Sequence, residues 1–383
     1  MTARGVSPLV GSVVLPIVRP TLPSLEELQP LLEQMWTSGI VTTGPIVRAF
    51  EKAVQDRLGV RRAVMVNHGT TALMLAARAL ALSGEVVISP FTWTATAGAL
   101  VWDGLEPVFA DVTPGRLTLD PQAAEAAITP RTTAIMPVNV FGVPPEMEAF
   151  ESLCRRRGLK LLSDSAQGLG AMYRGRHQGC FGDAECFSLS PTKVVTAIEG
   201  GLVTTDDDAL ADAVVSMRDS GKNADSSDIV RLGLSGRPSE FHAAVGLKNF
   251  ERMDALVAAR HERMAWYREL LSGLPGVGFQ EIPDDVVTTG NYFVVFVDES
   301  SSRVTRNALY KGLKLQGIET KRYFYPAVHL QGAYAHLRRR YEGRVPVAER
   351  AAAQGLAVPL YSHMTRADVE RVCERLRDAC SAA

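Results

Sequence analysis

Short apolar runs alternate with segments of helical periodicity through the first half of the chain. The runs are rich in Val, Ile and Leu, as in strands buried on both faces, and the segments between them repeat their apolar residues with a period of about 3.6. This alternation predicts an α/β fold with a mostly parallel central sheet between helices. The expected strands are 63–67, 85–90, 107–112, 133–140 and 159–165, and the expected helices are 70–82, 92–104, 121–128 and 145–158.

The pattern changes near residue 238. Residues 238–274 predict one long helix or two, with a proline at an early position and Gly and Pro at the end. A strand over 291–298, a helix over 303–317 and a final helix opening near 365 follow. We therefore expect two domains, a large one over residues 1–250 and a smaller C-terminal α+β domain over 251–383.

Composition narrows the class of protein. The 383 residues are 46% hydrophobic, enough for two buried cores. A net charge of -1 argues against nucleic acid or an anionic membrane as the main partner. The five cysteines are odd in number and form no C-x-x-C pair, and the seven histidines form no H-E-x-x-H motif, so neither a disulfide framework nor a metal site is expected. A reducing, cytoplasmic environment fits best.

The N-terminal apolar stretch, residues 7–18, contains Gly11 and Pro16 and lacks a small-residue cleavage pattern. It is too short to span a bilayer. We expect it to form an ordered arm or a first strand.

Polar residues follow three of the expected strands, at 67–71, 90–93 and 163–167. Ligands of open parallel sheets bind at the carboxyl ends of strands, so these turns are expected to meet at one site. Backbone N–H groups of Gly69 and Thr70 at a helix start would attract an anion such as phosphate. Taken singly, Asp164 could cap a helix and Trp93 could belong to the core.

The stretch "FSLSPTKVVTAIEGGLVTT" (187–205) adds Lys193. A single lysine is usually a solvated surface charge. A phosphate cradle, an aromatic face, a carboxylate and an amine are together the parts that hold pyridoxal phosphate. The residues thus favour this cofactor.

The chain resembles the DegT/DnrJ/EryC1/StrS sugar aminotransferases, which have the fold type I architecture. The resemblance covers nearly the whole chain and is most specific in "SDSAQ" and "FSLSPTKVVTAIEGG". Other matching segments are "GTTAL", "SPFTWTATAGALVWDGLEPVFADV", "GIETKRYFYPAVH" and "AVPLYSHMT".

The resemblance implies a role for each matching residue. Lys193 would hold the cofactor as an internal aldimine and then move a proton. The remaining cofactor contacts would be Asp164 at the pyridine nitrogen, Gln167 at the ring oxygen, Trp93 over the ring face, and Ser188, Gly69 and Thr70 at the phosphate. Glu199 is expected to be structural, and the two glycines after it would allow a tight return of the chain.

The chain departs from the family pattern at two positions. Relatives usually carry a small hydroxyl residue where this chain has His68, and an asparagine in G-x-N-x-R where it has Ser235. In relatives that asparagine reaches the partner's cofactor phosphate. Ser235 would make a shorter version of this bond, or water would fill the gap. The resemblance implies a homodimer with shared active sites.

The substrate site is expected in "ETKRYFYPAVH", where Tyr323, Tyr325 and His329 are the candidate contacts. Aromatic faces hold sugars or bases, and neighbouring cations suit a diphosphate. His329 could equally be a structural histidine, and Arg338 to Arg340 are expected on a solvated helix face.

These residues predict an aminotransferase that takes an amino group from an amino acid, with L-glutamate as the expected donor, and passes it to the ketone of a nucleotide-linked keto-sugar. A free keto-cyclitol is an alternative acceptor, and a non-catalytic, cofactor-binding regulatory protein is a further alternative. A dinucleotide-binding alternative at residues 168–175 lacks the third glycine and the following amphipathic helix. Lysine at position 193, where the dehydratase branch has histidine, favours transamination.

Overall fold

The computed structural model describes residues 15–381. Its largest element is a seven-stranded sheet, the large sheet, with strand order β1-β9-β8-β5-β4-β2-β3. Its strands are β1 (Arg62–Val66), β2 (Glu85–Ile88), β3 (Glu106–Phe109), β4 (Thr132–Met136), β5 (Lys160–Asp164), β8 (Ala184–Ser188) and β9 (Gly201–Thr205). β9 runs antiparallel to β1 and β8, and the other neighbours pair in parallel. The expected α/β fold with a mostly parallel sheet is confirmed.

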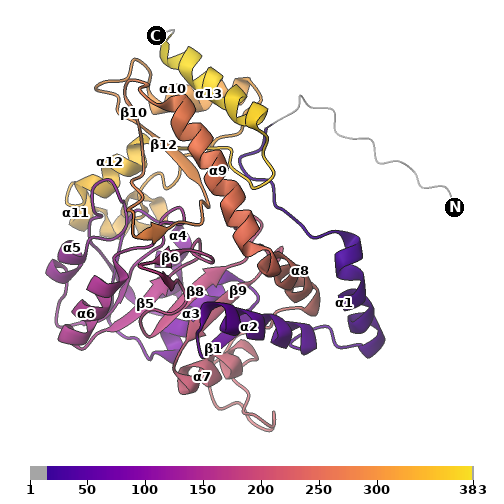
Figure 1. Ribbon diagram of the computed structural model, residues 1–383. Coiled ribbons are helices and arrows are strands. Elements are labelled where there is room, and N and C mark those ends of the chain that lie inside the picture. Colours follow the sequence, from indigo (N-terminus) through magenta and orange to yellow (C-terminus); the bar gives the residue numbers. More distant parts are fainter. Residues whose placement is uncertain (1–14, 382–383) are drawn as a thin grey trace.

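Helices cover both faces of the large sheet (Figure 1). Successive strand residues point to opposite faces, and so Val86 packs in the cluster of one helix layer while Val87 packs in that of the other. One layer consists of α3 (Gly69–Ala79), α4 (Thr94–Trp102) and α7 (Asp208–Arg218). The other consists of α1 (Leu25–Ser38), α2 (Pro45–Leu58), α5 (Pro121–Ala126), α6 (Met147–Arg157) and α8 (Glu240–Glu251).

Side-chain caps fix where several of these helices begin. Ser24 and Glu27 form a reciprocal capping box at α1, and Asp120, Asp207 and Ser239 accept backbone hydrogen bonds at the starts of α5, α7 and α8. Such caps satisfy N–H groups that the helix itself leaves unpaired, each stabilising by about 1 kcal/mol. The helix starts are therefore specified locally.

A second, three-stranded antiparallel sheet, the small sheet, is built from the C-terminal part of the chain. Its strands are β10 (Val277–Phe279), β12 (Phe293–Val297) and β13 (Gly355–Val358), and its covering helices are α9 (Met253–Leu271), α10 (Arg306–Leu315) and α13 (Arg366–Ser381). A third, short sheet joins β6 (Met172–Tyr173), β7 (Arg176–His177) and β11 (Val286–Val287).

The expected helical stretch 238–274 forms two helices, α8 and α9, with a break at Arg252 (φ -107°, ψ 14°). α9 joins the two parts of the molecule: Met253 packs with the helices under the large sheet, and Tyr267 packs in the core of the small sheet. Figure 1 shows α9 running from α8 toward α13. The segment after residue 327 returns to the large sheet, because Val328 and Tyr341 join its core. This segment contains η1 (Val328–Leu330), η2 (Gly332–Leu337), α11 (Arg338–Tyr341) and α12 (Pro346–Gln354).

The domain boundary expected near residue 250 stays a prediction. Of the expected N-terminal arm, residues 7–14 lie outside the described residues, and Leu15 forms a parallel bridge with Ile318. Arg338 to Arg340 are exposed, as expected. Of the helices between residues 15 and 381, none combines the length and the apolar composition needed to cross a membrane.

Candidate active site

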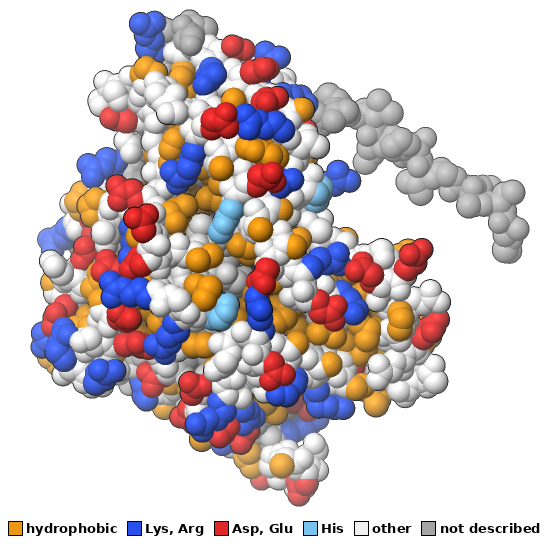
Figure 2. Space-filling model, viewed as in Figure 1, with side chains coloured by type: hydrophobic (Ala, Val, Ile, Leu, Met, Phe, Trp, Pro, Cys, Tyr) orange, Lys and Arg blue, Asp and Glu red, His pale blue; other side chains and the backbone are white. Residues whose placement is uncertain are grey.

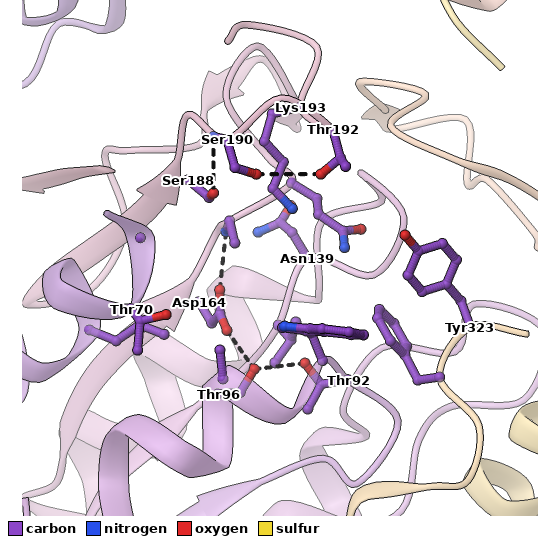
Figure 3. A pocket seen from close by; sticks show the side chains of 18 of the residues that line it. Thr70, Thr92, Thr96, Asn139, Asp164, Ser188, Ser190, Thr192, Lys193 and Tyr323 are labelled. Atoms are coloured by element: carbon purple, nitrogen blue, oxygen red, sulfur yellow. Dashed lines mark hydrogen bonds between the residues drawn. The ribbon is translucent and has the colours of Figure 1, made fainter. Parts of the chain in front are cut away.

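A cavity of about 240 Å³ lies at the carboxyl ends of β1, β2 and β5. Its walls come from the starts of α3 and α4, the loop between β8 and β9, and residues 321–324. Figure 3 shows these side chains pointing into one space. This is the edge of the sheet at which the three polar turns were expected to meet.

One end of the cavity is a cradle of hydrogen-bond donors. Gly69 and Thr70 form the first turn of α3, where the helix itself leaves backbone N–H groups unpaired and able to hold an anion; in this structure the Thr70 N–H donates to Nδ1 of His68 at 3.2 Å. Ser188, the last residue of β8, lies beside them: a Cβ atom on Gly69 would come 2.8 Å from the Cβ atom of Ser188. Glycine is thus required for this close approach, and the three expected phosphate contacts are brought together.

The floor of the cavity carries a buried carboxylate. Asp164 ends β5 and is 3% exposed. Its Oδ2 accepts a 2.6 Å hydrogen bond from the Thr96 hydroxyl, and its Oδ1 accepts a 3.1 Å bond from the Ala166 N–H. Burial raises the pKa of Asp164, while Thr96, Ala166 N–H and the charge of Lys193 lower it in part. A cationic or N–H group in the cavity would therefore stabilise the ionised form.

Lys193 enters the cavity from the loop that joins β8 to β9. Three backbone hydrogen bonds hold this loop: Leu189 N–H to Gly200 O (2.9 Å), Ala197 N–H to Leu189 O (2.9 Å) and Lys193 N–H to Ser190 O (3.0 Å). In Figure 3 Lys193 and Asp164 point into the cavity from opposite sides. The amine and the carboxylate thus flank a space where a small aromatic ring could lie.

The two glycines after Glu199 act differently from the tight return that the sequence suggested. Neither has a positive φ angle; the left-handed residue of this turn is Ile198, at φ 68°. A Cβ atom on Gly201 would lie 2.5 Å from the carbonyl oxygen of His68 and 2.8 Å from the N atom of Gly69. Gly201 is therefore needed so that β9 can lie against the first turn of α3.

Aromatic residues and one cation form the open side of the cavity. Trp93 is 52% exposed, and its ring centroid lies 6.4 Å from that of Tyr323. The Lys321 ammonium lies 5.3 Å from the Trp93 ring centroid and 4.7 Å from the Tyr323 centroid. The Tyr323 hydroxyl donates a 3.1 Å hydrogen bond to that of Tyr292. Trp93 and Tyr323 thus line the cavity as expected.

Two buried amide oxygens at the cavity have no hydrogen-bond partner within residues 15–381: Oε1 of Gln167 and Oδ1 of Asn139. The Asn139 Nδ2 donates to Ser165 (3.0 Å) and Gln178 (2.9 Å). Buried polar atoms rarely stay unpaired. The unpaired oxygens, the donor cradle, the carboxylate and the amine fit pyridoxal phosphate.

The structure does not bring Tyr325, His329 or Ser235 to this cavity. Tyr325 is 45% exposed and stacks on Arg306. His329 is fully buried, and its Nε2 bonds Glu349 Oε1 at 3.0 Å, which is the structural alternative for this residue. Ser235 is exposed, and its carbonyl oxygen accepts from Asn67 Nδ2 at 3.2 Å. The bond from Ser235 to a partner's cofactor stays a prediction.

Sequence reasoning missed Thr96, Asn139 and Tyr292 as lining residues. Asn139 had a usable signal in the sequence, because it comes shortly after the carboxyl end of β4. Asp164 lies at the carboxyl end of the neighbouring parallel strand β5, at the same edge of the sheet. Thr96 lies one turn into α4, where its contact with Asp164 depends on how the helix packs. Tyr292 comes from the C-terminal part of the chain and has no local signal.

Comparison with known proteins agrees with this geometry. The sequence model of the DegT/DnrJ/EryC1/StrS aminotransferase family matches residues 24–377. GDP-perosamine synthase of Caulobacter vibrioides is 35% identical over 371 residues, which cover 94% of this chain and 98% of that protein.

Two solved structures extend the comparison. DesI, solved in the presence of its TDP-sugar product, superposes with a TM-score of 0.91 at 34% identity, covering 97% of this chain and 94% of that one. NtdA of Bacillus subtilis, with bound cofactor PMP, superposes with a TM-score of 0.85 at 25% identity, covering 93% and 82%.

Proposed function

Because the chain belongs to the DegT/DnrJ/EryC1/StrS aminotransferase family, we propose that it is a pyridoxal-phosphate enzyme that transfers an amino group from L-glutamate to the ketone of a nucleotide-linked keto-sugar. The observation that carries this proposal is that Lys193 and Asp164 face one cavity from opposite sides, beside the donor cradle at Gly69 and Thr70.

Bound pyridoxal phosphate would supply an aldehyde that forms an imine with an amine and a ring that withdraws electrons. Gly69, Thr70 and Ser188 would hold its phosphate through backbone and hydroxyl donors. Asp164 would pair with the protonated ring nitrogen, which replaces the hydration that burial removes from the carboxylate. Gln167 would bond the ring oxygen, and Trp93 would cover one face of the ring.

Lys193 would act twice through the same Nζ atom. Its amine would hold the aldehyde of the cofactor, and as a free amine it would remove a proton from the α-carbon of the amino donor and deliver one to the carbon of the acceptor. The hydrogen bonds that fix the Lys193 loop keep this amine over the cavity. An amine held at this side of the cavity suits proton transfer on one face of the substrate.

The acceptor's phosphates are proposed to lie at the open side of the cavity. Lys321 offers a cation there, and Trp93 and Tyr323 offer apolar ring surfaces to a sugar. A free keto-cyclitol would have no use for this cation, and we therefore favour the nucleotide-linked acceptor. The intact set Lys193, Asp164 and Gln167 speaks against a non-catalytic role.

A homodimer forms part of the proposal. Exposed apolar side chains lie on α1, in the turn after it and on α8, and Figure 2 shows hydrophobic side chains in this region. They include Leu25, Trp36, Ile40, Val41 and Phe241. Several large apolar side chains exposed in one region are typical of an interaction site. A second copy that covers this surface would bring its own Ser235 toward the cofactor phosphate of the first, and each active site would then be completed by the other copy.

An absorbance spectrum taken before and after addition of L-glutamate tests the proposal. The wild type should carry a visible band from Lys193-bound cofactor, and glutamate should convert it to the pyridoxamine form. Lys193→Ala should lack the band, whereas Lys248→Ala, at a surface lysine paired with Glu251, should keep it. Wild-type protein that takes up no added cofactor would refute the proposal.

A further inference from the structure

The side chain of His68 accepts a hydrogen bond from a backbone N–H group that a bound phosphate would also need. It caps α3, and its Nδ1 accepts a 3.2 Å hydrogen bond from the backbone N–H of Thr70. Since the donor is a backbone N–H, Nδ1 must be unprotonated here. The neutral imidazole then carries its hydrogen on Nε2.

The other ring nitrogen faces a carboxylate. Nε2 of His68 lies 3.4 Å from Oε2 of Glu199. This oxygen is buried and has no hydrogen-bond partner among the described residues. Glu199 also acts on the neighbouring His242, whose pKa is lowered by burial and raised in part by that carboxylate. Glu199 is thus placed to stabilise a positive charge on His68.

A phosphate in the cradle would change what His68 can do. The Thr70 N–H would then donate to a phosphate oxygen instead of to His68. Nδ1 of His68 would be left as an acceptor without a donor, next to the phosphate dianion. Two acceptors facing each other repel, and a buried acceptor without a donor is costly. A proton on Nδ1 removes both problems, because the imidazolium donates from both nitrogens.

We propose that His68 is a phosphate-responsive residue of the cofactor cradle. In the empty cradle the neutral ring caps Thr70. When the phosphate dianion binds, Nδ1 takes one proton from solvent, which reaches this half-exposed side chain, and the imidazolium donates from Nδ1 to the phosphate and from Nε2 to Glu199. No bond other than this N–H is formed. The inference rests on the proposed function, because it concerns the same cofactor.

Comparing the affinities of two ligands isolates the contribution of the phosphate group from that of the rest of the cofactor. Pyridoxamine phosphate cannot bond covalently to Lys193, and pyridoxamine has the same ring without the phosphate. Calorimetry near pH 8, where phosphate esters are dianions and ordinary histidines are neutral, gives both affinities. Repeating the titration in buffers of different ionisation enthalpy gives the number of protons taken up.

His68→Asn tests the charge while keeping a helix cap, because asparagine is a good N-cap residue. We expect the affinity for pyridoxamine phosphate to fall about tenfold, as for loss of a charge-assisted hydrogen bond, and proton uptake to fall by close to one. The affinity for pyridoxamine should not change. Glu199→Gln should lower phosphate-ligand affinity and proton uptake in the same direction.

His242→Asn is the matched control, since His242 also neighbours Glu199 but does not line the cavity. It should leave both affinities and the proton count unchanged. If the ratio of the affinity for pyridoxamine phosphate to that for pyridoxamine, and the proton uptake, were the same in wild type and His68→Asn, His68 would be a helix cap only and the inference would be overturned. A wild type that binds neither ligand would overturn the proposed function itself.

Discussion

The hydroxyl of Thr96, on α4, donates a 2.6 Å hydrogen bond to the carboxylate of Asp164, at the end of β5. A second hydroxyl, that of Thr92, lies 2.8 Å from the Thr96 oxygen. Both threonines are buried. The pair thus forms a short polar chain that orients the one carboxylate on the cavity floor and helps to keep it ionised.

Thr96→Val removes the donor and keeps the shape of the side chain. The pKa of Asp164 should rise further, because one of the two hydrogen bonds that lower it is lost. We expect turnover and cofactor affinity to fall about tenfold, the order of a hydrogen bond to a charged group. Thr96→Ser, measured by the same assays, should retain most of both; equal loss in the two variants would show that packing matters instead.

Gly69→Ala tests the cradle. The added Cβ would lie 2.8 Å from the Cβ of Ser188, so the start of α3 must move away from β8. Affinity for pyridoxal phosphate should fall at least tenfold, because the phosphate loses its aligned donors. Gly312→Ala in α10, where a Cβ meets no atom within 4 Å, is the control and should stabilise the fold by about 0.5–1 kcal/mol in thermal unfolding.

Lys321 and Arg322 are adjacent cations with different surroundings. Lys321 lines the cavity, whereas Arg322 lies over Tyr310 and bonds Asn307 at 3.4 Å. Lys321→Gln should raise the KM for the nucleotide-linked acceptor about tenfold, as expected for the loss of one charge-assisted phosphate contact. Arg322→Gln should leave it unchanged. Initial-rate kinetics with both variants decide this, and an equal effect of the two would contradict a specific contact at Lys321.

Glu185 predicts a pH-dependent stability. It is fully buried and accepts hydrogen bonds from Ser165 Oγ (2.5 Å), Gly179 N–H (2.6 Å) and Phe181 N–H (2.9 Å). Burial raises its pKa from 4.5 to about 7. The folded chain thus binds this proton more tightly than the unfolded chain does, and the resulting stability is complete below about pH 4.5 and is lost as the pH rises through about 7.

Glu185→Gln keeps an oxygen acceptor and cannot titrate. As the pH rises from 5 to 8, the wild type should therefore lose about 2–3 kcal/mol of unfolding free energy relative to the variant, because only the wild type loses the stability that comes from the protonated Glu185. Chemical denaturation at a series of pH values measures this. Glu251→Gln, at an exposed residue of α8, is the surface control measured in the same way, and a flat profile for Glu185→Gln would contradict the assignment.

Local patterns predicted the elements that carry the fold. Strands such as β2 and β4 and helices such as α3 and α6 are visible in the sequence because each buries continuous or periodic apolar surface. The carboxyl-end rule then located Gly69, Trp93 and Asp164. Lys193 needed the longer motif around it, because an isolated lysine carries no such signal.

Other parts of the site depend on contacts between distant segments. Thr96 reaches Asp164 because the start of α4 lies at the carboxyl end of β5. Tyr292 meets Tyr323 because Phe293 and Lys321, near them in the chain, both pair with β13. His329 carries the same sequence pattern whether it faces a substrate or Glu349, and tertiary packing selects Glu349. Such choices have no local periodicity from which to be inferred.

The close approach of Gly201 to His68 and Gly69 has a mechanical consequence. The hairpin that carries Lys193 and the helix start that would grip the phosphate touch through their backbones, without an intervening side chain that could change rotamer. A displacement of β9 is therefore transmitted directly to the start of α3, so that the base of the loop that carries Lys193 is tied to the place where a phosphate would bind.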